Sequence, residues 1–301
     1  MSILPGPAEP PDLPPGYEPR SGLFEQWREV GPGVLVRRSR VLDLNVTVAL
    51  GRERALVVDT HAHAGYAAAL LAAVREITPL PLVVANTHAH FDHTFGNAAF
   101  AAEQADLEIW AQAGCRSELA RRGKRQREVA AGWFRDAGLD DDARAVLAAE
   151  ILPPNRTFAD GAELDLGGRI VVLHHPGRAH TDHDTVVDVP DAGVSVVGDL
   201  VEEGAPPSFE DAYPLDWAIT LTALLPRLHP VVVPGHGDVV DPAFVAAQRD
   251  NLDVVAEAVR ALPSRTDETD LLRAAAGLPV GRRAGLDALR RSLALRVPGE
   301  G

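Results

Sequence analysis

Cysteine is almost absent from the sequence, which has a single one, Cys115, among 301 residues. A disulfide framework within the chain is therefore excluded, and one thiol is compatible with a reducing compartment. No stretch approaches the roughly 18 consecutive apolar residues of a transmembrane helix. The first residues also lack the basic start and apolar core of a secretory signal. These absences predict a cytoplasmic protein that does not contact membranes.

Basic charge is also scarce. Lys124 is the only lysine, and 29 basic residues face 43 acidic ones, which gives a formal net charge of -14. An acidic surface repels phosphate backbones, so nucleic acid is a poor candidate partner. The rest of the composition, 46% hydrophobic and 24% charged, is ordinary for a globular protein and excludes collagen, coiled coil and wholesale disorder.

Hydrophobic periodicity predicts one α/β domain at residues 21–245, preceded by a proline-rich extension at 1–20 and followed by helices at 246–301 that pack on the same domain. The domain includes a charged helical insert at 112–150 and a polar loop at 86–95. The predicted strands are 34–36, 44–50, 55–59, 82–85, 169–173, 185–189, 194–197 and 231–233. The predicted helices are 65–77, 97–105, 112–150, 216–228 and several after 242.

Four side chains of metal-binding type lie within six residues of that polar loop: His88, His90, Asp92 and His93. In extended backbone, alternate side chains point the same way, so His88, His90 and Asp92 share one side. A turn there can direct Asp92 and His93 to a neighbouring position. Because imidazole and carboxylate groups suit zinc, iron or manganese, the segment predicts a metal site.

Three later segments share one arrangement, in which an apolar strand ends, glycine frees the backbone and one ligand-type residue appears. His180 comes after strand 169–173, Asp199 after 194–197 and His236 after 231–233. Loops at strand ends are where α/β folds assemble their sites. We therefore expect these three residues to complete the metal site.

The H-x-H-x-D-H motif at 88–93, together with the later histidines and aspartate, resembles the metallo-β-lactamase superfamily of metallohydrolases over about residues 30–245. The resemblance implies an αββα sandwich, in which two mixed β-sheets are flanked by helices. It also implies two divalent metal ions, with zinc preferred and iron or manganese as alternatives. The implied ligands are His88, His90 and His180 for the first ion, Asp92, His93 and His236 for the second, and Asp199 bridging both.

The resemblance further implies a binuclear hydrolase acting on a small molecule with a carbonyl group: a thioester, ester, lactone or β-lactam-like amide. Metal binding can lower the pKa of water to about 7, so a hydroxide bridging the ions could attack the carbonyl. The two ions, two carboxylates and hydroxide leave a net charge of about +1, which favours an oxyanion in the transition state. Asp92 is the candidate catalytic residue because its carboxylate could orient the hydroxide. Asp59 is expected to support a ligand.

Asp199 stands where some zinc β-lactamases have a cysteine ligand, and this pattern is more similar to glyoxalase II and other thioester, ester or lactone hydrolases. Three alternatives stay open. A mononuclear-iron persulfide dioxygenase of the same fold would use the first ion's ligands alone. A tRNA-processing nuclease of the same family is disfavoured by the net charge. An amidohydrolase on a β/α barrel would use His61 and His63, which are otherwise expected near the metal or in solvent, but eight evenly spaced strand–helix units are missing.

Residues near the ligands carry further expectations. Asp184 and His183 are candidates for supporting the site, although for His183 the favoured interpretation is exposure at the surface. Phe209, Tyr213 and Trp217 either line the substrate pocket or pack their loop onto the core. A basic run at 121–127 could meet an anionic carrier such as coenzyme A or a phosphopantetheine arm, or form a solvated helix face. The oligomeric state stays open.

Overall fold

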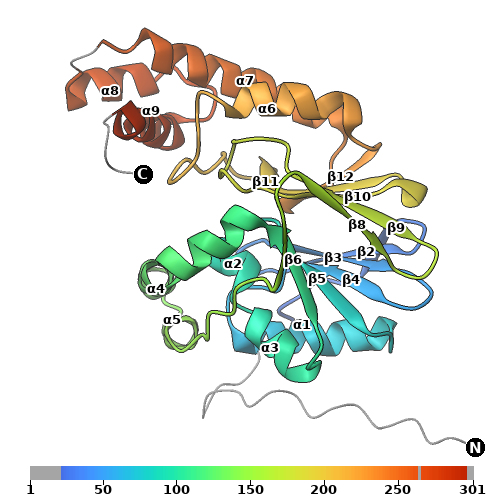
Figure 1. Ribbon diagram of the computed structural model, residues 1–301. Coiled ribbons are helices and arrows are strands. Elements are labelled where there is room, and N and C mark those ends of the chain that lie inside the picture. The colour runs from blue at the N-terminus through green and yellow to red at the C-terminus, as the bar shows by residue number, and fades with distance from the viewer. Residues whose placement is uncertain (1–21, 264–265, 297–301) are drawn as a thin grey trace, which may run out of the picture. The chain divides into compact units, whose positions relative to one another are not determined.

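The computed structural model describes residues 22–263 and 266–296 (Figure 1). The extension expected at 1–20 lies outside the described residues. The chain divides into two compact units, each with its own sheet and hydrophobic core. Of the described residues, unit 1 comprises 22–28, 35–158 and 165–169, and unit 2 comprises 29–34, 159–164, 170–263 and 266–296.

A seven-stranded sheet, most of which belongs to unit 1, has its strands in the order of the sequence. They are β1 (Arg28–Gly31), β2 (Val34–Arg38), β3 (Asn45–Leu50), β4 (Ala55–Val58), β5 (Leu82–Ala85), β6 (Glu108–Gln112) and β7 (Arg156–Phe158). β3 is antiparallel to β4, whereas β4, β5, β6 and β7 run parallel. The loops that follow β4 and β5 therefore leave the same edge of the sheet, and this edge carries the histidine motif.

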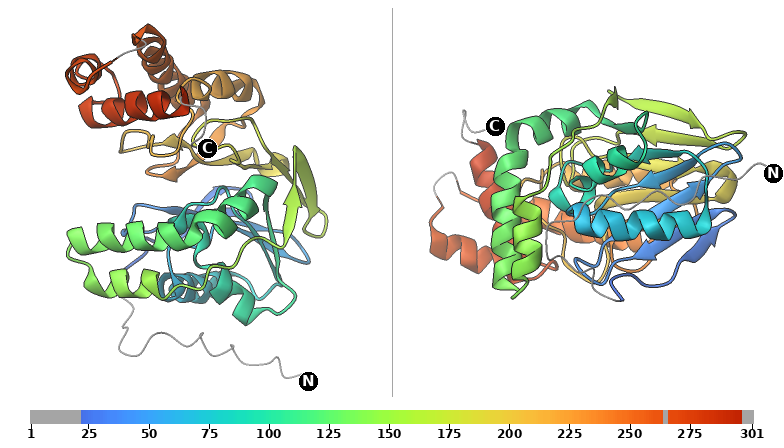
Figure 2. Two further views of the ribbon diagram at one scale, coloured as in Figure 1. Left: turned by 60° about the vertical axis from the view of Figure 1, so that its left-hand side comes forward. Right: turned by 90° about the horizontal axis from the view of Figure 1, so that it is seen from below.

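Five helices belong to unit 1. They are α1 (Ala64–Ile77), α2 (Phe91–Thr94), α3 (Asn97–Glu103), α4 (Ala113–Asp136) and α5 (Asp140–Leu147). α1 buries Leu70, Leu71 and Val74 against the sheet core, because these residues repeat at helical spacing. α4 and α5 lie side by side (Figure 2).

Unit 2 contains a five-stranded mixed sheet in the order β12-β11-β10-β9-β8. Its strands are β8 (Gly161–Asp165), β9 (Ile170–His174), β10 (Val186–Val189), β11 (Val194–Glu202) and β12 (Val231–His236). β11 is parallel to β12 and antiparallel to β10. Its helical elements are η1 (Pro190–Ala192), α6 (Trp217–Leu224), η2 (Leu225–Arg227), α7 (Pro242–Ala261), α8 (Glu268–Ala275) and α9 (Arg282–Arg296).

The expected fold class is confirmed, because both sheets are mixed and helices flank them. Several local expectations need correction. The polar loop expected at 86–95 contains the short helix α2, and the strand expected at 194–197 continues to Glu202. β1, β6, β7 and β8 were not expected, because they lack the continuous apolar runs of the equally short strands β4 and β5. No helix in the described ranges is long and apolar enough to cross a membrane.

Candidate metal centre

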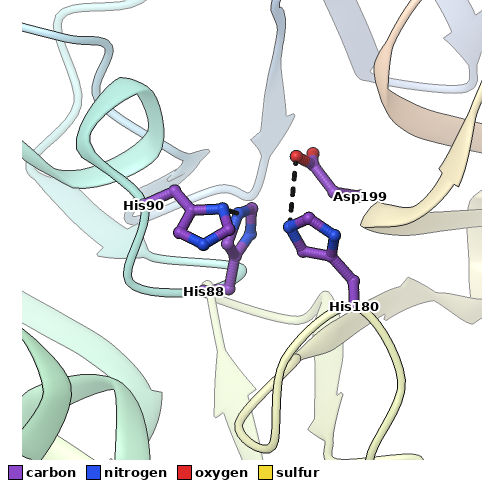
Figure 3. A group of neighbouring side chains, drawn as sticks. All are labelled: His88, His90, His180 and Asp199. Carbon is purple, nitrogen blue, oxygen red and sulfur yellow. Dashed lines mark hydrogen bonds and ion pairs between the residues drawn. The ribbon is translucent and has the colours of Figure 1, made fainter. Parts of the chain in front are cut away.

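Among the described residues, histidine and aspartate side chains form two groups whose atoms could hold a metal ion. The first group, drawn in Figure 3, consists of His88, His90, His180 and Asp199. The second consists of Asp92, His93 and His236. The residues of each unit are described separately below.

Asp59 organises the contribution of unit 1. It directly follows β4, and its carboxylate accepts hydrogen bonds from the backbone N–H of Thr87 at 2.8 Å and from the Thr87 hydroxyl at 2.7 Å. Nδ1 of His93 lies 2.8 Å from Asp59 Oδ2. An ionised carboxylate can only accept, so Nδ1 of His93 carries the proton and Nε2 presents its lone pair. Asp59 thereby sets the tautomer that a metal ligand needs.

The short helix α2 places the remaining ligands of unit 1. His90 is its N-cap residue, and Asp92 and His93 lie in its single turn. Nε2 of His88 lies 2.9 Å from Nδ1 of His90, and Nε2 of His93 lies 3.7 Å from Asp92 Oδ2 (Figure 3 draws the first pair). These four side chains therefore form two pairs within one unit, and each pair belongs to a different group.

Two asparagines that the sequence analysis missed hold the backbone of this turn. The side chains of Asn86 and Asn97 bond reciprocally at 2.8 and 3.1 Å. Asn86 also donates to the carbonyl of His93 at 3.1 Å, and the backbone N–H of Thr60 donates to the same carbonyl at 2.9 Å. No spacing or periodicity signals these residues, because their hydrogen bonds form only when β5, α2 and α3 have folded.

Asp199 is central to the contribution of unit 2. Its Oδ2 lies 3.5 Å from Nε2 of His180 and 3.4 Å from Nε2 of His236. One carboxylate oxygen therefore faces a histidine of each ligand group. Asp199 lies within β11 and His236 ends β12, so the parallel pairing of these strands fixes their relative position.

Gly235 makes room for this carboxylate. A Cβ atom built on Gly235 would stand 1.8 Å from Asp199 Oδ1 and 3.0 Å from its Cγ. Real Cβ contacts are never this short, so a side chain at position 235 would displace the carboxylate. The glycine that precedes His236 is therefore a steric requirement of the Asp199 position.

Asp184 shapes the loop that carries His180. Its carboxylate accepts from the Thr181 backbone N–H at 2.8 Å and from the Thr181 hydroxyl at 2.7 Å. These bonds close a tight turn directly after His180. The sequence analysis named Asp184 as a supporting residue, and the contacts show which atoms it holds.

His183 is buried, with 3% of its surface exposed, so the alternative of an exposed histidine is wrong. Its Nδ1 lies 2.7 Å from Asp182 Oδ1, and the hydroxyl of Tyr213 donates to Asp182 Oδ2 at 3.0 Å. The hydrogen bond from His183 lowers the pKa of Asp182 to about 2, although burial opposes the shift. A carboxylate thus links His183 to Tyr213 within unit 2.

The other two aromatic candidates for the pocket lie in the core of unit 2. Phe209 and Trp217 are buried, and their rings pack at a centroid distance of 5.4 Å. Trp217 donates its indole N–H to the carbonyl of Leu200 at 3.1 Å. Phe209 and Trp217 therefore pack their loop onto the core, which was one of the two expectations for them. Tyr213 is partly exposed.

His61 and His63 belong to neither ligand group, and both are buried rather than in solvent. Nδ1 of His61 accepts from the Ala62 backbone N–H at 2.8 Å, and Nδ1 of His63 accepts from the N–H groups that open α1. The β/α-barrel alternative that would have made them ligands is wrong, because the chain has two mixed sheets instead of one closed barrel.

The chain belongs to the metallo-β-lactamase superfamily, because the model of that family matches residues 40–236. A metallo-beta-lactamase from Pontibacter korlensis is 20% identical, with a TM-score of 0.62 over 76% of this chain and 98% of that chain. FIM-1 from Pseudomonas aeruginosa, in its mono-zinc form, is 17% identical, with a TM-score of 0.60 over 77% and 96%. Such low identities establish the shared fold alone. No curated protein sequence matches the chain.

The donor set fits divalent metal ions. The two groups combine five imidazoles with two carboxylates, and each member is buried or half-buried. Zinc and related ions take these donor types, and the hydrogen bond from His93 to Asp59 is typical of a metal-binding histidine. The protein is thus a member of a metallohydrolase superfamily with histidine and aspartate groups able to bind metal ions.

Proposed function

We propose that the protein is a binuclear, zinc-dependent hydrolase of small carbonyl compounds. The observation that carries this proposal is the position of Asp199, whose Oδ2 lies about equally far from His180 and His236. A carboxylate placed in this way suits a bridge between two ions. His88, His90 and His180 would hold one ion, and Asp92, His93 and His236 would hold the other.

Two bound divalent ions would supply a hydroxide at neutral pH and polarise the substrate carbonyl. Side chains of the protein would orient the water and hold the ligands in place. Asp92 would accept a hydrogen bond from the attacking water and orient it, and Asp59 would keep the Nδ1 proton on His93. Asp184 would hold the turn after His180, with His183 beside it.

The substrate class follows from the same ligand set. Asp199 in place of a cysteine supports thioesters, esters or lactones, and the names of the structural neighbours add β-lactams to the compounds to be tested. The single cysteine and the net charge of -14 support a cytoplasmic protein that does not act on nucleic acid.

Elemental analysis of protein purified without chelator or added metal tests the proposal. We expect about two zinc ions per chain. One iron per chain would contradict the binuclear assignment and favour persulfide oxidation, which an oxygen-consumption assay would detect. Protein that contains no metal and takes up none on titration would overturn the catalytic assignment.

Variants complete the test on any substrate that the enzyme hydrolyses. His88→Ala, Asp92→Ala and Asp199→Ala should each lower kcat/KM by about 100-fold or more, because each removes a ligand. His229→Ala is the matched control, since His229 belongs to neither ligand group. Full turnover by Asp92→Ala would contradict the two-metal mechanism.

A further inference from the structure

One face of α4 differs from the rest of this acidic chain. Arg121, Arg125, Val129 and Trp133 are spaced four residues apart, and residues at this spacing are neighbours on a helix surface. All four are exposed, including 42% of Val129 and 47% of Trp133. We call these four residues the α4 stripe. Its first half is cationic and its second half is apolar.

The apolar end of the stripe lies beside the ligand-bearing turn of the same unit. The Trp133 ring packs against Phe91 at a centroid distance of 5.7 Å, and Phe91 stands between the ligands His90 and Asp92. Phe134, the neighbour of Trp133, also contacts Phe91 and is buried. A molecule that reaches α2 from this side would therefore meet Trp133.

The cationic end of the stripe carries more positive charge than its neighbours neutralise. Arg121 and Arg122 share a single carboxylate, that of Glu118, at 2.6 and 3.4 Å. Lys124 and Arg125 are exposed, and neither forms an ion pair with another of the described residues. An exposed arginine next to a lysine can bind a phosphate group through two parallel hydrogen bonds supported by a second charge.

We propose that the α4 stripe binds the leaving group of the substrate, as a long arm with an apolar segment and a terminal phosphate. The arm would lie along Trp133 and Val129 and place its phosphate at Arg125 and Lys124. Eight residues separate Trp133 from Arg125, a rise of about 12 Å along the helix. The stripe therefore favours an extended arm over a compact leaving group.

This inference rests on the proposed hydrolase function and narrows its substrates to phosphate-bearing thioesters. Hydrolysis would break the bond between the acyl carbon and sulfur. Water would give its hydroxyl to the acyl carbon and a proton to the sulfur. The products would be a carboxylic acid and an arm that leaves as a free thiol.

Calorimetric titration with coenzyme A and with pantetheine, which lacks the phosphates, tests the stripe directly. Both probes carry the same thiol, so any binding of sulfur to metal cancels in the comparison. We expect the wild-type protein at low salt to bind coenzyme A about tenfold more tightly than pantetheine. Arg125→Glu should weaken coenzyme A binding by about tenfold and leave pantetheine binding unchanged.

Arg116→Glu is the matched control for charge. Arg116 is exposed on the same helix, but it lies nine residues from Arg125, which places it about 180° away around the helix axis.

Trp133→Ala should weaken the binding of both probes, and an unchanged metal content would show that α2 is intact. Equal binding of the two probes, or an equal loss in Arg116→Glu, would overturn the proposal. Binding of a short RNA as tightly as coenzyme A would also overturn the proposal, because the surface would then bind polyanions in general.

Hydrolysis assays separate this inference from the proposed function. Octanoyl-coenzyme A should have a lower KM than the octanoyl thioester of N-acetylcysteamine, which lacks the phosphates. The same kcat/KM for both thioesters would contradict leaving-group binding by the α4 stripe, but not the proposed hydrolase function. Specific binding of coenzyme A without hydrolysis of any carbonyl compound would contradict the proposed hydrolase function, but not the binding of a phosphate-bearing arm by the α4 stripe.

Discussion

At the scale of single residues, the metal ligands depend on neighbours that are not themselves ligands. Asp59 and Asp184 each accept two hydrogen bonds from a threonine that adjoins a ligand, one in each unit. These bonds fix a backbone turn and a side-chain direction together. Changes at such positions should therefore alter metal affinity while leaving every ligand in place.

Asp59→Asn should weaken metal binding about 10- to 100-fold. The amide nitrogen would donate a hydrogen bond where the carboxylate now accepts one from His93 Nδ1. The proton of His93 would therefore move from Nδ1 to Nε2. Nε2 could then no longer act as a ligand. Titration of the metal-free protein with zinc against a chelator of known affinity measures the change.

Asp188→Asn is the matched control for this prediction. Asp188 faces another buried histidine, His174, at 3.1 Å and accepts from the Ser195 hydroxyl at 2.6 Å, but it belongs to neither ligand group. We expect Asp188→Asn to lower the free energy of unfolding and leave zinc affinity unchanged. If both variants lose affinity equally, the effect is global destabilisation and not the His93 tautomer.

Gly235→Ala should displace the Asp199 carboxylate, because the new methyl group would lie 1.8 Å from Oδ1. We expect zinc affinity to fall by at least tenfold, and the free energy of unfolding to fall by about 1–3 kcal/mol, as for an overpacked site. Zinc titration and urea denaturation measure the two effects.

Gly132→Ala provides the comparison for Gly235→Ala. Position 132 lies within α4, and no atom comes within 4 Å of a Cβ built there. The same substitution should stabilise the protein by about 0.5–1 kcal/mol, because alanine favours the helix. Unchanged zinc binding by both variants would show that the Asp199 position tolerates the methyl group.

At the scale of elements, α1 begins on a buried histidine. His63 accepts hydrogen bonds through Nδ1 from the backbone N–H groups of Gly65 and Tyr66 at 3.2 and 3.4 Å. Its Nε2 lies 3.5 Å from Asp142 of α5, and the Tyr66 hydroxyl donates to the same carboxylate at 2.6 Å. The cap of one helix is thereby tied to the start of another.

Acidification should weaken this cap. Burial lowers the pKa of His63 below its ordinary value of 6.5, although Asp142 opposes the shift. The folded state therefore favours the neutral ring, whose Nδ1 accepts the N–H groups. Its stabilising contribution is present above pH 6.5 and is lost as the pH falls through the lowered pKa.

Urea denaturation between pH 5 and 8 measures this effect as the difference between the wild type and His63→Asn. Asparagine can cap the helix through its side-chain oxygen without titrating. The stability of the wild type should fall relative to that of His63→Asn as the pH drops below 6.5. A difference between the wild type and His63→Asn that does not change with pH would show that His63 does not contribute.

At this scale, some helices and strands could be predicted from the sequence and others could not. The α/β class could be predicted because apolar strands leave local patterns, whereas the two sheets followed from the family resemblance. The histidine motif and the later candidate ligands were noticed because each follows an apolar strand. β6 and β7 could not be predicted, since β6 begins and ends on polar residues and β7 contains only one buried apolar residue. The Asn86–Asn97 pair left no signal because its hydrogen bonds form only after β5 and α3 are in place.

At the scale of the whole molecule, the proposed metal ions would add to the stability that the two hydrophobic cores provide. Ions that bind the folded chain and not the unfolded chain raise its stability by mass action. The stabilisation is about 2.7 kcal/mol when free zinc is 100 times its dissociation constant. At about 2–4 °C per kcal/mol, this predicts a rise in Tm of roughly 5–10 °C over chelator-treated protein.

Scanning calorimetry of two variants shows whether the histidine motif binds zinc without the later candidate ligands. His90→Ala changes the motif, and His180→Ala changes a later candidate ligand. If the ions need both, each variant should lose most of the zinc-dependent rise in Tm, whereas His229→Ala should keep it. A rise that survives His180→Ala but not His90→Ala would mean that the histidine motif binds zinc alone. That outcome would contradict the role of Asp199 as a bridge, because Asp199 is also one of the later candidate ligands.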